Sequence, residues 1–262
     1  MSFSPPPPAL AAHSLLLAPE RLPLRPSASA EALGRVLVVA PHPDDESLGC
    51  GGLLALLARA GLSPEVAFVT DGAQSHPNSA AYPPARLRAV REAEALDALQ
   101  HLGLPAAAAH FLRYPDSALP PRGSTAFAAA VQETIALLRR VRPDTVLVAW
   151  RRDPHCDHEG AWRLFREAVG QLDMDERPRW LEYPVWAWAH ASTDRAPCAS
   201  DGRAWRLDVA GVLDQKRAAI DAHRSQLGLI TDDPGGFTLP ADFLPLFLRP
   251  WELFIEPNAA HA

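Results

Sequence analysis

Cysteine is scarce in this chain, and long apolar runs are missing. The three cysteines, Cys50, Cys156 and Cys198, form no C-x-x-C pair, which argues against a disulfide framework and indicates reduced thiols. Cys50 and Cys156 are best interpreted as small buried side chains. No apolar run approaches about 20 residues, so no transmembrane segment is expected. The N-terminal M-S-F-S-P-P-P-P also lacks the basic start of a signal peptide, and a cytoplasmic protein is expected.

Basic residues are outnumbered as well. The chain has 25 Lys and Arg against 31 Asp and Glu, for a formal net charge of -6, so nucleic acid is not expected as a partner. Nothing in the sequence decides whether the chain forms a homo-oligomer.

The 262 residues can bury a substantial core within one domain. Residues 1–33 are rich in proline and alanine and predict an irregular N-terminal arm, with a short strand or helix near 14–17. Residues 34–262 predict a single α/β domain in which strands and helices alternate. This alternation favours a Rossmann-like, mostly parallel sheet with helices on both faces.

The apolar patterns predict the individual elements. Strands are expected at 36–40, 65–70, 110–113, 145–150, 180–188, 205–209 and 253–255. Helices are expected at 50–60, 86–102, 124–142, 160–171 and 212–227. The loop 73–85 is long for a compact domain and predicts a functional segment.

Two polar clusters follow predicted strand ends. His42, Asp44, Asp45 and Glu46 come directly after strand 36–40, and crowding three carboxylates beside one imidazole is costly unless a cation or a reaction needs them. Glu46 also suits the positive end of a helix. A second cluster, His155 and His158, follows strand 145–150. If these strands lie close in the sheet, both clusters face one pocket, as at a catalytic zinc site with an open position.

These motifs resemble those of the PIG-L/LmbE-like deacetylases. P-H-P-D-D-E followed by a glycine-rich turn, with H-C-D-H downstream, is the pairing that carries the resemblance, which runs from Val36 to beyond Gln226. It implies a zinc-dependent enzyme that removes acyl groups from N-acetylglucosamine-type amines. Two departures, Pro41 for the usual alanine and Cys156 for the usual proline, concern loop shape and no expected ligand.

The resemblance implies roles for the motif residues. His42, Asp45 and His158 would bind one zinc ion per chain. Asp44 would be the general base, and His155 would stabilise the oxyanion or protonate the leaving amine.

It also implies three substrate-binding residues. Arg91 and Glu94 form an R-x-x-E pattern, which is followed by a small residue, Ala98, and then by Leu102-Gly103. Arg91 would contact the substrate. Asp116, in a Pro-Asp pair after the third strand, would bind sugar hydroxyls. His223, within the K-x-x-A-x-x-x-H-x-S-Q segment from Lys216 to Gln226, would line the pocket.

The residues leave alternatives open. Two histidines and one carboxylate also describe an iron(II) oxygenase site, although Asp44 placed as a base favours hydrolysis. A non-catalytic sugar-binding protein on the same scaffold is the third alternative. Arg151 and Arg152 are candidate partners for a phosphate or carboxylate on the substrate, whose identity the sequence leaves undecided.

Overall fold

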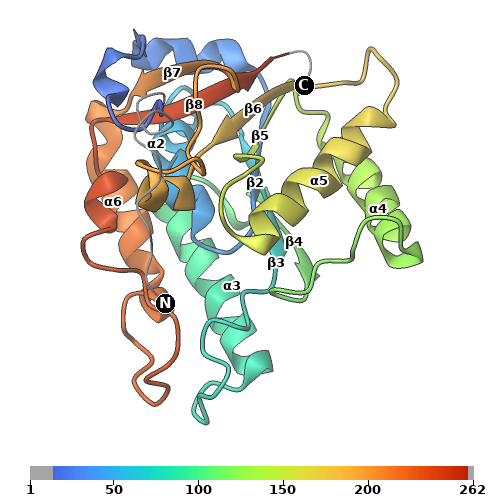
Figure 1. The fold of residues 1–262 in the computed structure, drawn as a ribbon, viewed down its shortest axis with the longest axis vertical. Helices are drawn as coiled ribbons and strands as arrows, with labels where there is room; N and C mark the ends of the chain where they lie inside the picture. Colours follow the sequence, from blue (N-terminus) through green and yellow to red (C-terminus); the bar gives the residue numbers. More distant parts are fainter. Residues whose placement is uncertain (1–13, 259–262) are drawn as a thin grey trace.

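A computed structural model describes residues 14–258, which form one eight-stranded sheet with the order β1-β7-β8-β6-β5-β2-β3-β4 (Figure 1). Neighbouring strands are parallel except at β8, which runs antiparallel to both β6 and β7. The strands are β1 (Leu24–Arg25), β2 (Val36–Ala40), β3 (Glu65–Thr70), β4 (Ala109–Tyr114), β5 (Thr145–Ala149), β6 (Arg179–Tyr183), β7 (Gly202–Asp208) and β8 (Trp251–Pro257). The predicted mostly parallel α/β fold is confirmed.

Helices cover both faces of the sheet. They are α2 (Asp45–Arg59), α3 (Pro84–His101), α4 (Thr125–Val141), α5 (Cys156–Gly170) and α6 (Leu213–Ala222). Helices α2, α3 and α6 pack on one face, and α4 and α5 pack together on the other (Figure 1). The side chains of β2 alternate between the two apolar cores, with Val38 in the first and Val39 in the second. This explains why the strand is apolar at every position.

The order of the central strands places the two polar clusters together. Strand β2 pairs in parallel with β5 on one side and with β3 on the other. The chain leaves β2 for α2 on one face and leaves β5 for α5 on the opposite face. The carboxyl ends of β2 and β5 therefore flank a switch point, where ligands bind in open α/β sheets.

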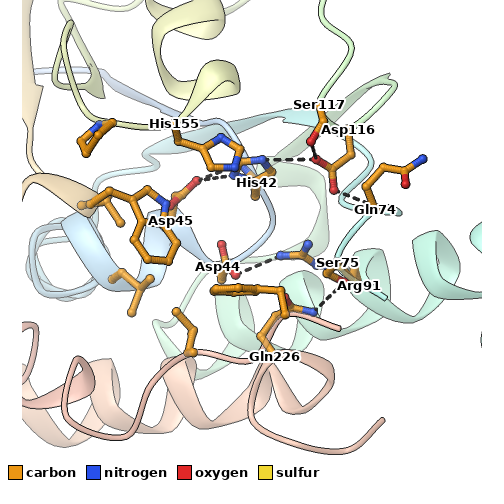
Figure 2. A pocket seen from close by; sticks show the side chains of 16 residues that line it. His42, Asp44, Asp45, Gln74, Ser75, Arg91, Asp116, Ser117, His155 and Gln226 are labelled. Carbon is orange, nitrogen blue, oxygen red and sulfur yellow. Dashed lines mark hydrogen bonds and ion pairs between the residues drawn. The ribbon is translucent and has the colours of Figure 1, made fainter. Parts of the chain in front are cut away.

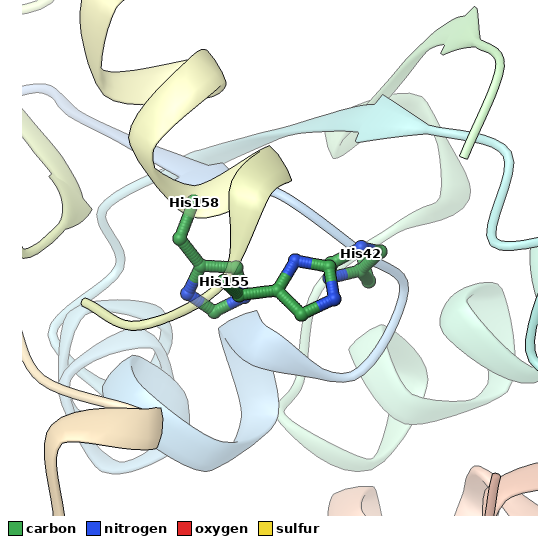
Figure 3. A group of neighbouring side chains, drawn as sticks. All are labelled: His42, His155 and His158. Atoms are coloured by element: carbon green, nitrogen blue, oxygen red, sulfur yellow. The ribbon is translucent and has the colours of Figure 1, made fainter. Parts of the chain in front are cut away.

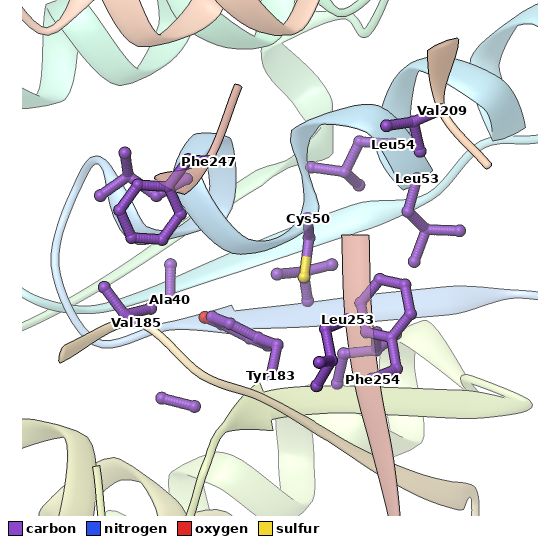
Figure 4. Close-up of a cluster of buried hydrophobic side chains, with 14 of the residues drawn as sticks. Ala40, Cys50, Leu53, Leu54, Tyr183, Val185, Val209, Phe247, Leu253 and Phe254 are labelled. Atoms are coloured by element: carbon purple, nitrogen blue, oxygen red, sulfur yellow. The ribbon is translucent and has the colours of Figure 1, made fainter. Parts of the chain in front are cut away.

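Several element ends differ from the sequence prediction. The helices expected to begin at residues 50 and 160 begin earlier, at Asp45 and Cys156, within the two motifs, so the glycines of the first motif lie inside α2. The glycines allow close packing, because a Cβ on Gly49 would collide with the Tyr183 ring and one on Gly52 would collide with the Val209 side chain. Figure 4 shows this contact region around Cys50 and Tyr183.

Two further predicted elements are too long. The strand expected to reach residue 188 ends at Tyr183, because Pro184 follows and cannot donate to the ladder, and a 3₁₀ helix covers Trp186–His190. The helix expected at 212–227 ends at Ala222, and a 3₁₀ turn covers Arg224–Gln226.

Part of the N-terminal arm is regular. Strand β1 pairs in parallel with β7, and a 3₁₀ helix covers Ser27–Leu33. Ser14 forms an isolated bridge with Cys198. Residues 1–13 of the arm lie outside the described residues, and the domain boundary at residue 34 stays a prediction. Within the described part, no helix is long and apolar enough to cross a membrane.

A buried ion pair holds α2 on the sheet. Lys216 Nζ donates to Glu252 Oε1 at 2.6 Å, and the Glu252 carboxylate also accepts the backbone amides of Gly52 at 2.6 Å and Leu53 at 2.8 Å. Lys216 and Glu252 are 1% and 3% exposed, so loss of either would leave an unpaired buried charge.

The substitution Lys216→Met keeps most of the side-chain volume but isolates the Glu252 carboxylate. It should lower the free energy of unfolding by about 3–5 kcal/mol in urea titrations, and adding Glu252→Gln should restore part of the loss. Arg163→Ala, which breaks an exposed pair with Glu159, is the control and should cost at most about 1 kcal/mol. A loss below about 1 kcal/mol for Lys216→Met would show that the pair does not hold the helix.

Candidate active site

The first motif forms a tight turn between β2 and α2. Asp44 has φ 155°, a conformation that non-glycine residues rarely adopt, and its backbone amide donates to Glu46 Oε2 at 3.0 Å. Strained backbone of this kind concentrates at functional sites, where surrounding contacts hold it. The turn directs His42, Asp44 and Asp45 into one pocket.

His42 is held on both ring nitrogens. Nε2 lies 3.1 Å from Asp157 Oδ2, and Nδ1 lies 3.2 Å from Asp45 Oδ2. Burial lowers the pKa of His42, but hydrogen bonds to Asp116, Asp157 and Asp45 outweigh it and raise the pKa well above its ordinary value. The surroundings of this ring therefore favour a positive charge.

His158 also lies between two carboxylates, but here Nε2 rather than Nδ1 faces Asp45. Nδ1 lies 2.7 Å from Asp153 Oδ2, and Nε2 lies 3.2 Å from Asp45 Oδ2. Nε2 makes no hydrogen bond of acceptable geometry with any described residue, although His158 is fully buried. Burial lowers the His158 pKa, but Asp45 and Asp153 outweigh it and raise the value to about 9.

Asp153 is a residue that sequence reasoning missed. Its fully buried carboxylate accepts the His158 ring and the backbone amides of Val185, Trp186 and Ala187, at 2.7–3.2 Å. Asp157, also missed although it lies inside H-C-D-H, accepts the His42 ring and the Ser117 amide at 2.7 Å. An ionised carboxylate can only accept, so each ring carries a proton on the nitrogen that faces its carboxylate.

The remaining atoms converge on one point. His42 Nδ1 and His158 Nε2 each lie 3.2 Å from Asp45 Oδ2. The other nitrogen of each ring is hydrogen-bonded, to Asp157 in His42 and to Asp153 in His158. Two imidazoles and one carboxylate, with each ring held on its other nitrogen by Asp157 or Asp153, form a candidate metal site, and this donor set is one that catalytic zinc sites use. His42, His155 and His158 also lie close enough to share an ion (Figure 3), their nitrogens within 4.8 Å of one another.

His155 has a different bonding pattern from the other two histidines. As the N-cap of α5, its Nδ1 accepts the Asp157 amide at 3.2 Å, so the neutral ring carries its proton on Nε2. Burial, with His42 and His158 nearby, lowers the His155 pKa to about 4. The ring is therefore a neutral hydrogen-bond donor at neutral pH, and it lines the pocket.

Asp44 pairs with Arg91. Arg91 Nη2 donates to Asp44 Oδ2 at 2.9 Å and to the Pro43 carbonyl at 2.8 Å, while Nη1 donates to the Gly72 carbonyl at 3.0 Å. Burial raises the Asp44 pKa to about 6, despite the opposing charge of Arg91. Arg91 lines the pocket, but its guanidinium lies against the Asp44 carboxylate, and its contact with substrate stays a prediction.

The other sequence candidates divide between the pocket and its surroundings. Asp116 lines the pocket, with Oδ1 3.6 Å from His42 Nε2 and Oδ2 accepting the Gln74 amide. His223 does not line it: the ring is 1% exposed and lies 3.0 Å from Glu46 Oε1, so its expected position is corrected. Burial lowers the His223 pKa, but the Glu46 charge outweighs it and raises the value.

The pocket encloses about 310 Å³ and has two kinds of wall (Figure 2). The polar wall includes Gln74 and Ser75 from the long loop after β3, together with Asp116 and Gln226, and a function for that loop stays a prediction. The apolar wall consists of Leu48, Val185, Trp186, Phe237 and Leu239. Phe237 and Leu239 come from a segment in which the sequence offered no motif.

Comparisons with known proteins agree with this geometry. The family model described as PIG-L: GlcNAc-PI de-N-acetylase matches residues 37–169. The 1D-myo-inositol 2-acetamido-2-deoxy-alpha-D-glucopyranoside deacetylase of Corynebacterium urealyticum is 31% identical over 240 residues, which cover 74% of this chain and 71% of that protein. The 2'-N-acetylparomamine deacetylase of Streptomyces fradiae is 31% identical over 221 residues, covering 76% and 75%.

A solved structure shares the fold. The zinc inhibited form of teicoplanin deacetylase Orf2 aligns with a TM-score of 0.58 at 22% identity, covering 74% of this chain and 85% of that one. At this identity the likeness shows the fold alone.

The role of Asp153 can be tested by metal binding. Asp153→Asn keeps the shape but removes the charged acceptor for His158 Nδ1, so the affinity for Zn²⁺ should fall about 10–100-fold in a chelator-competition titration. Asp201→Asn, which changes another buried carboxylate, is the control and should leave metal affinity unchanged. Equal zinc affinity in Asp153→Asn and the unaltered chain would remove Asp153 from this role.

Proposed function

This chain belongs to the PIG-L family, and we propose that it uses one zinc ion, held by His42, Asp45 and His158, to hydrolyse the N-acyl bond of a small amino-sugar glycoside. Its relatives are deacetylases of N-acetylated sugar compounds, and the chain is accordingly an amide hydrolase. The metal and the roles of the individual residues are the proposed part.

The observation that carries the metal proposal is the convergence of three donor atoms. Asp45 Oδ2 lies 3.2 Å from both His42 Nδ1 and His158 Nε2, and outer carboxylates hold the protons of both rings on their far nitrogens. Burial raises the Asp45 pKa, but the His158 charge outweighs it and holds the value well below its ordinary range. Asp45 is favoured over His155 as the third ligand because His155 Nδ1 already accepts a backbone amide.

The protein residues surround the metal with the groups that amide hydrolysis needs. A bound zinc ion acidifies water and polarises a carbonyl. Asp44, which we propose binds no metal, accepts the proton of the attacking water. Arg91 holds the Asp44 carboxylate in place at 2.9 Å.

His155 completes the reaction. Its Nε2–H donates to the oxygen of the amide as negative charge develops there, and removing one such donor typically costs about 10²–10³ in rate. The nitrogen of the cleaved bond must gain a proton to leave as an amine, and the proton that Asp44 collects balances this step. Water and the amide thus yield a carboxylic acid and an amino sugar.

The alternative functions have less support. The curated relatives carry out deacetylation, which favours hydrolysis over the iron(II) oxygenase alternative. A non-catalytic sugar-binding protein would not need Asp44 held in a strained backbone conformation beside the metal ligands.

If Asp44 is the general base, replacing it should slow turnover without removing the metal. Asp44→Asn should retain zinc but release amine from N-acetylglucosamine glycosides about 10²–10⁴-fold more slowly, because the amide cannot accept the water proton. The measurement is kcat together with metal content by elemental analysis. Loss of zinc from Asp44→Asn would instead mean that Asp44 is a ligand and that its role was exchanged with that of Asp45.

A further inference from the structure

Two irregular loops contribute to the walls of the pocket. The β3–α3 loop, residues 71–83, carries Gln74 and Ser75 of the polar wall, and the C-terminal loop, residues 227–243, carries Phe237 and Leu239 of the apolar wall. Within residues 227–243 the structure has no helix or strand. A loop of this length in a compact domain is usually functional or disordered, so the contacts that hold it against the pocket matter.

The two walls are joined directly to each other. The Phe237 amide donates to the Ser75 carbonyl at 2.6 Å, and the Leu239 amide donates to the Gln226 carbonyl at 2.9 Å. Gln226 Nε2 in turn donates to Ser75 Oγ at 3.3 Å (Figure 2). The spacing between the polar and apolar walls therefore depends on the two loops staying together.

Asp232 of the C-terminal loop binds the β3–α3 loop through both carboxylate oxygens. Oδ1 accepts the Ser79 hydroxyl at 2.7 Å, and Oδ2 accepts the Ala81 amide at 2.9 Å. The hydrogen bond from the Ala81 amide, followed by that from Ser79, lowers the pKa of the Asp232 carboxyl from its ordinary value. The carboxylate is therefore ionised at neutral pH, where it only accepts, and both of its oxygens serve the other loop.

Asp233 joins the loops from the adjacent position, and its side chain is buried. Oδ2 accepts the Asn78 amide at 2.8 Å, and Oδ1 accepts the Gly235 amide of its own loop at 3.2 Å. Next to this contact, Gly236 packs so closely on the His76 ring that a Cβ on Gly236 would collide with it. The two aspartates thus lie where the loops fit tightly against each other.

We propose that Asp232 and Asp233, which we call the aspartate latch, are positioning residues for the substrate. They hold the two loops together, so that Ser75 and Phe237 are in place before the amino sugar binds. Neither aspartate lines the pocket, so the latch acts through the two walls. This inference rests on the proposed function and gives both loops a role in substrate affinity that neither the metal nor the base supplies.

Walls that are already in place lower the cost of binding. When only a fraction of the free molecules has the binding-competent arrangement, the apparent dissociation constant rises by the inverse of that fraction. Loss of the latch should therefore raise KM. The bound complex keeps the same groups around the amide, so kcat should stay near its original value. A residue that only stabilised the fold would not separate the two constants in this way.

Asp233→Ala removes two hydrogen bonds, one of them to the other loop. In zinc-loaded protein, KM for the methyl glycoside of N-acetylglucosamine should rise about 5–10-fold, while kcat stays within about twofold and the metal content is unchanged. Asp221→Ala removes the same charge from an exposed position of α6 and should leave both constants unchanged. An unchanged KM in Asp233→Ala, or a fall in kcat alone, would overturn the inference.

Asparagine substitutions distinguish the two positions of the latch. Asp232→Asn can accept the Ala81 amide with its oxygen and donate to Ser79 Oγ with its nitrogen, so KM should change by less than about twofold, whereas Asp232→Ala should raise it several-fold. Asp233→Asn cannot replace both acceptors, because its nitrogen would face a backbone N–H, so it should behave like Asp233→Ala. Equal KM values for Asp232→Asn and Asp232→Ala would overturn the role of Asp232 in the latch.

Binding without turnover separates this inference from the proposed function. The dissociation constant of the same glycoside would be measured by calorimetry with zinc-loaded Asp44→Asn protein, with and without Asp233→Ala. Weaker binding by about 5–10-fold in the double variant, with no amine released by the unaltered enzyme, would support the latch and overturn the proposed function. Amine release by the unaltered enzyme, with equal binding in the two variants, would support the proposed function and overturn the latch.

Discussion

The site depends on the hydrogen bonds that two buried carboxylates make to the outer nitrogens of two histidines. Asp157 holds His42 through Nε2, and Asp153 holds His158 through Nδ1, so the opposite nitrogens both face Asp45, where a bound cation would take the place of their protons. Without these bonds each ring could rotate or exchange its proton, and the three donor atoms would not have a defined geometry. Asp153 extends the constraint further, because it also fixes the backbone of the segment that carries Trp186 into the pocket.

The sheet makes this arrangement possible by pairing β2 with β5 in parallel. His42 and Asp157 then meet at the site although more than a hundred positions separate them in the chain, because one follows the end of β2 and the other follows the end of β5. The cost of gathering so many buried carboxylates is met by specific partners: Arg91 for Asp44, the histidine rings for Asp45, Asp153 and Asp157, and His223 for Glu46. A cation at the centre would reduce the remaining repulsion.

The sequence predicted the features that local chemistry determines. Continuous apolar runs identified β2, β3 and β5, and the position of polar residues directly after them identified both clusters. The starts of α2 and α5 were placed too late, because glycines and aspartates have low helix propensity, and the close packing of Gly49 on Tyr183 and of Gly52 on Val209 is not visible in the sequence. His223 and Arg91 were recognised as motif residues. Their partners in the structure, Glu46 for His223 and Asp44 for Arg91, are distant in the chain, so the positions of the two side chains could not be read from the sequence.

The measurement that tests the central claim most directly is the metal dependence of amide hydrolysis. Purified protein would be analysed for metals, stripped with a chelator, and titrated with Zn²⁺ while amine release from an N-acetylglucosamine glycoside is followed. The account predicts that stripped protein releases no amine and that activity returns and saturates at one equivalent of zinc per chain. Full amine release by metal-free protein would contradict it, as would tightly bound iron in a protein that releases no amine with zinc.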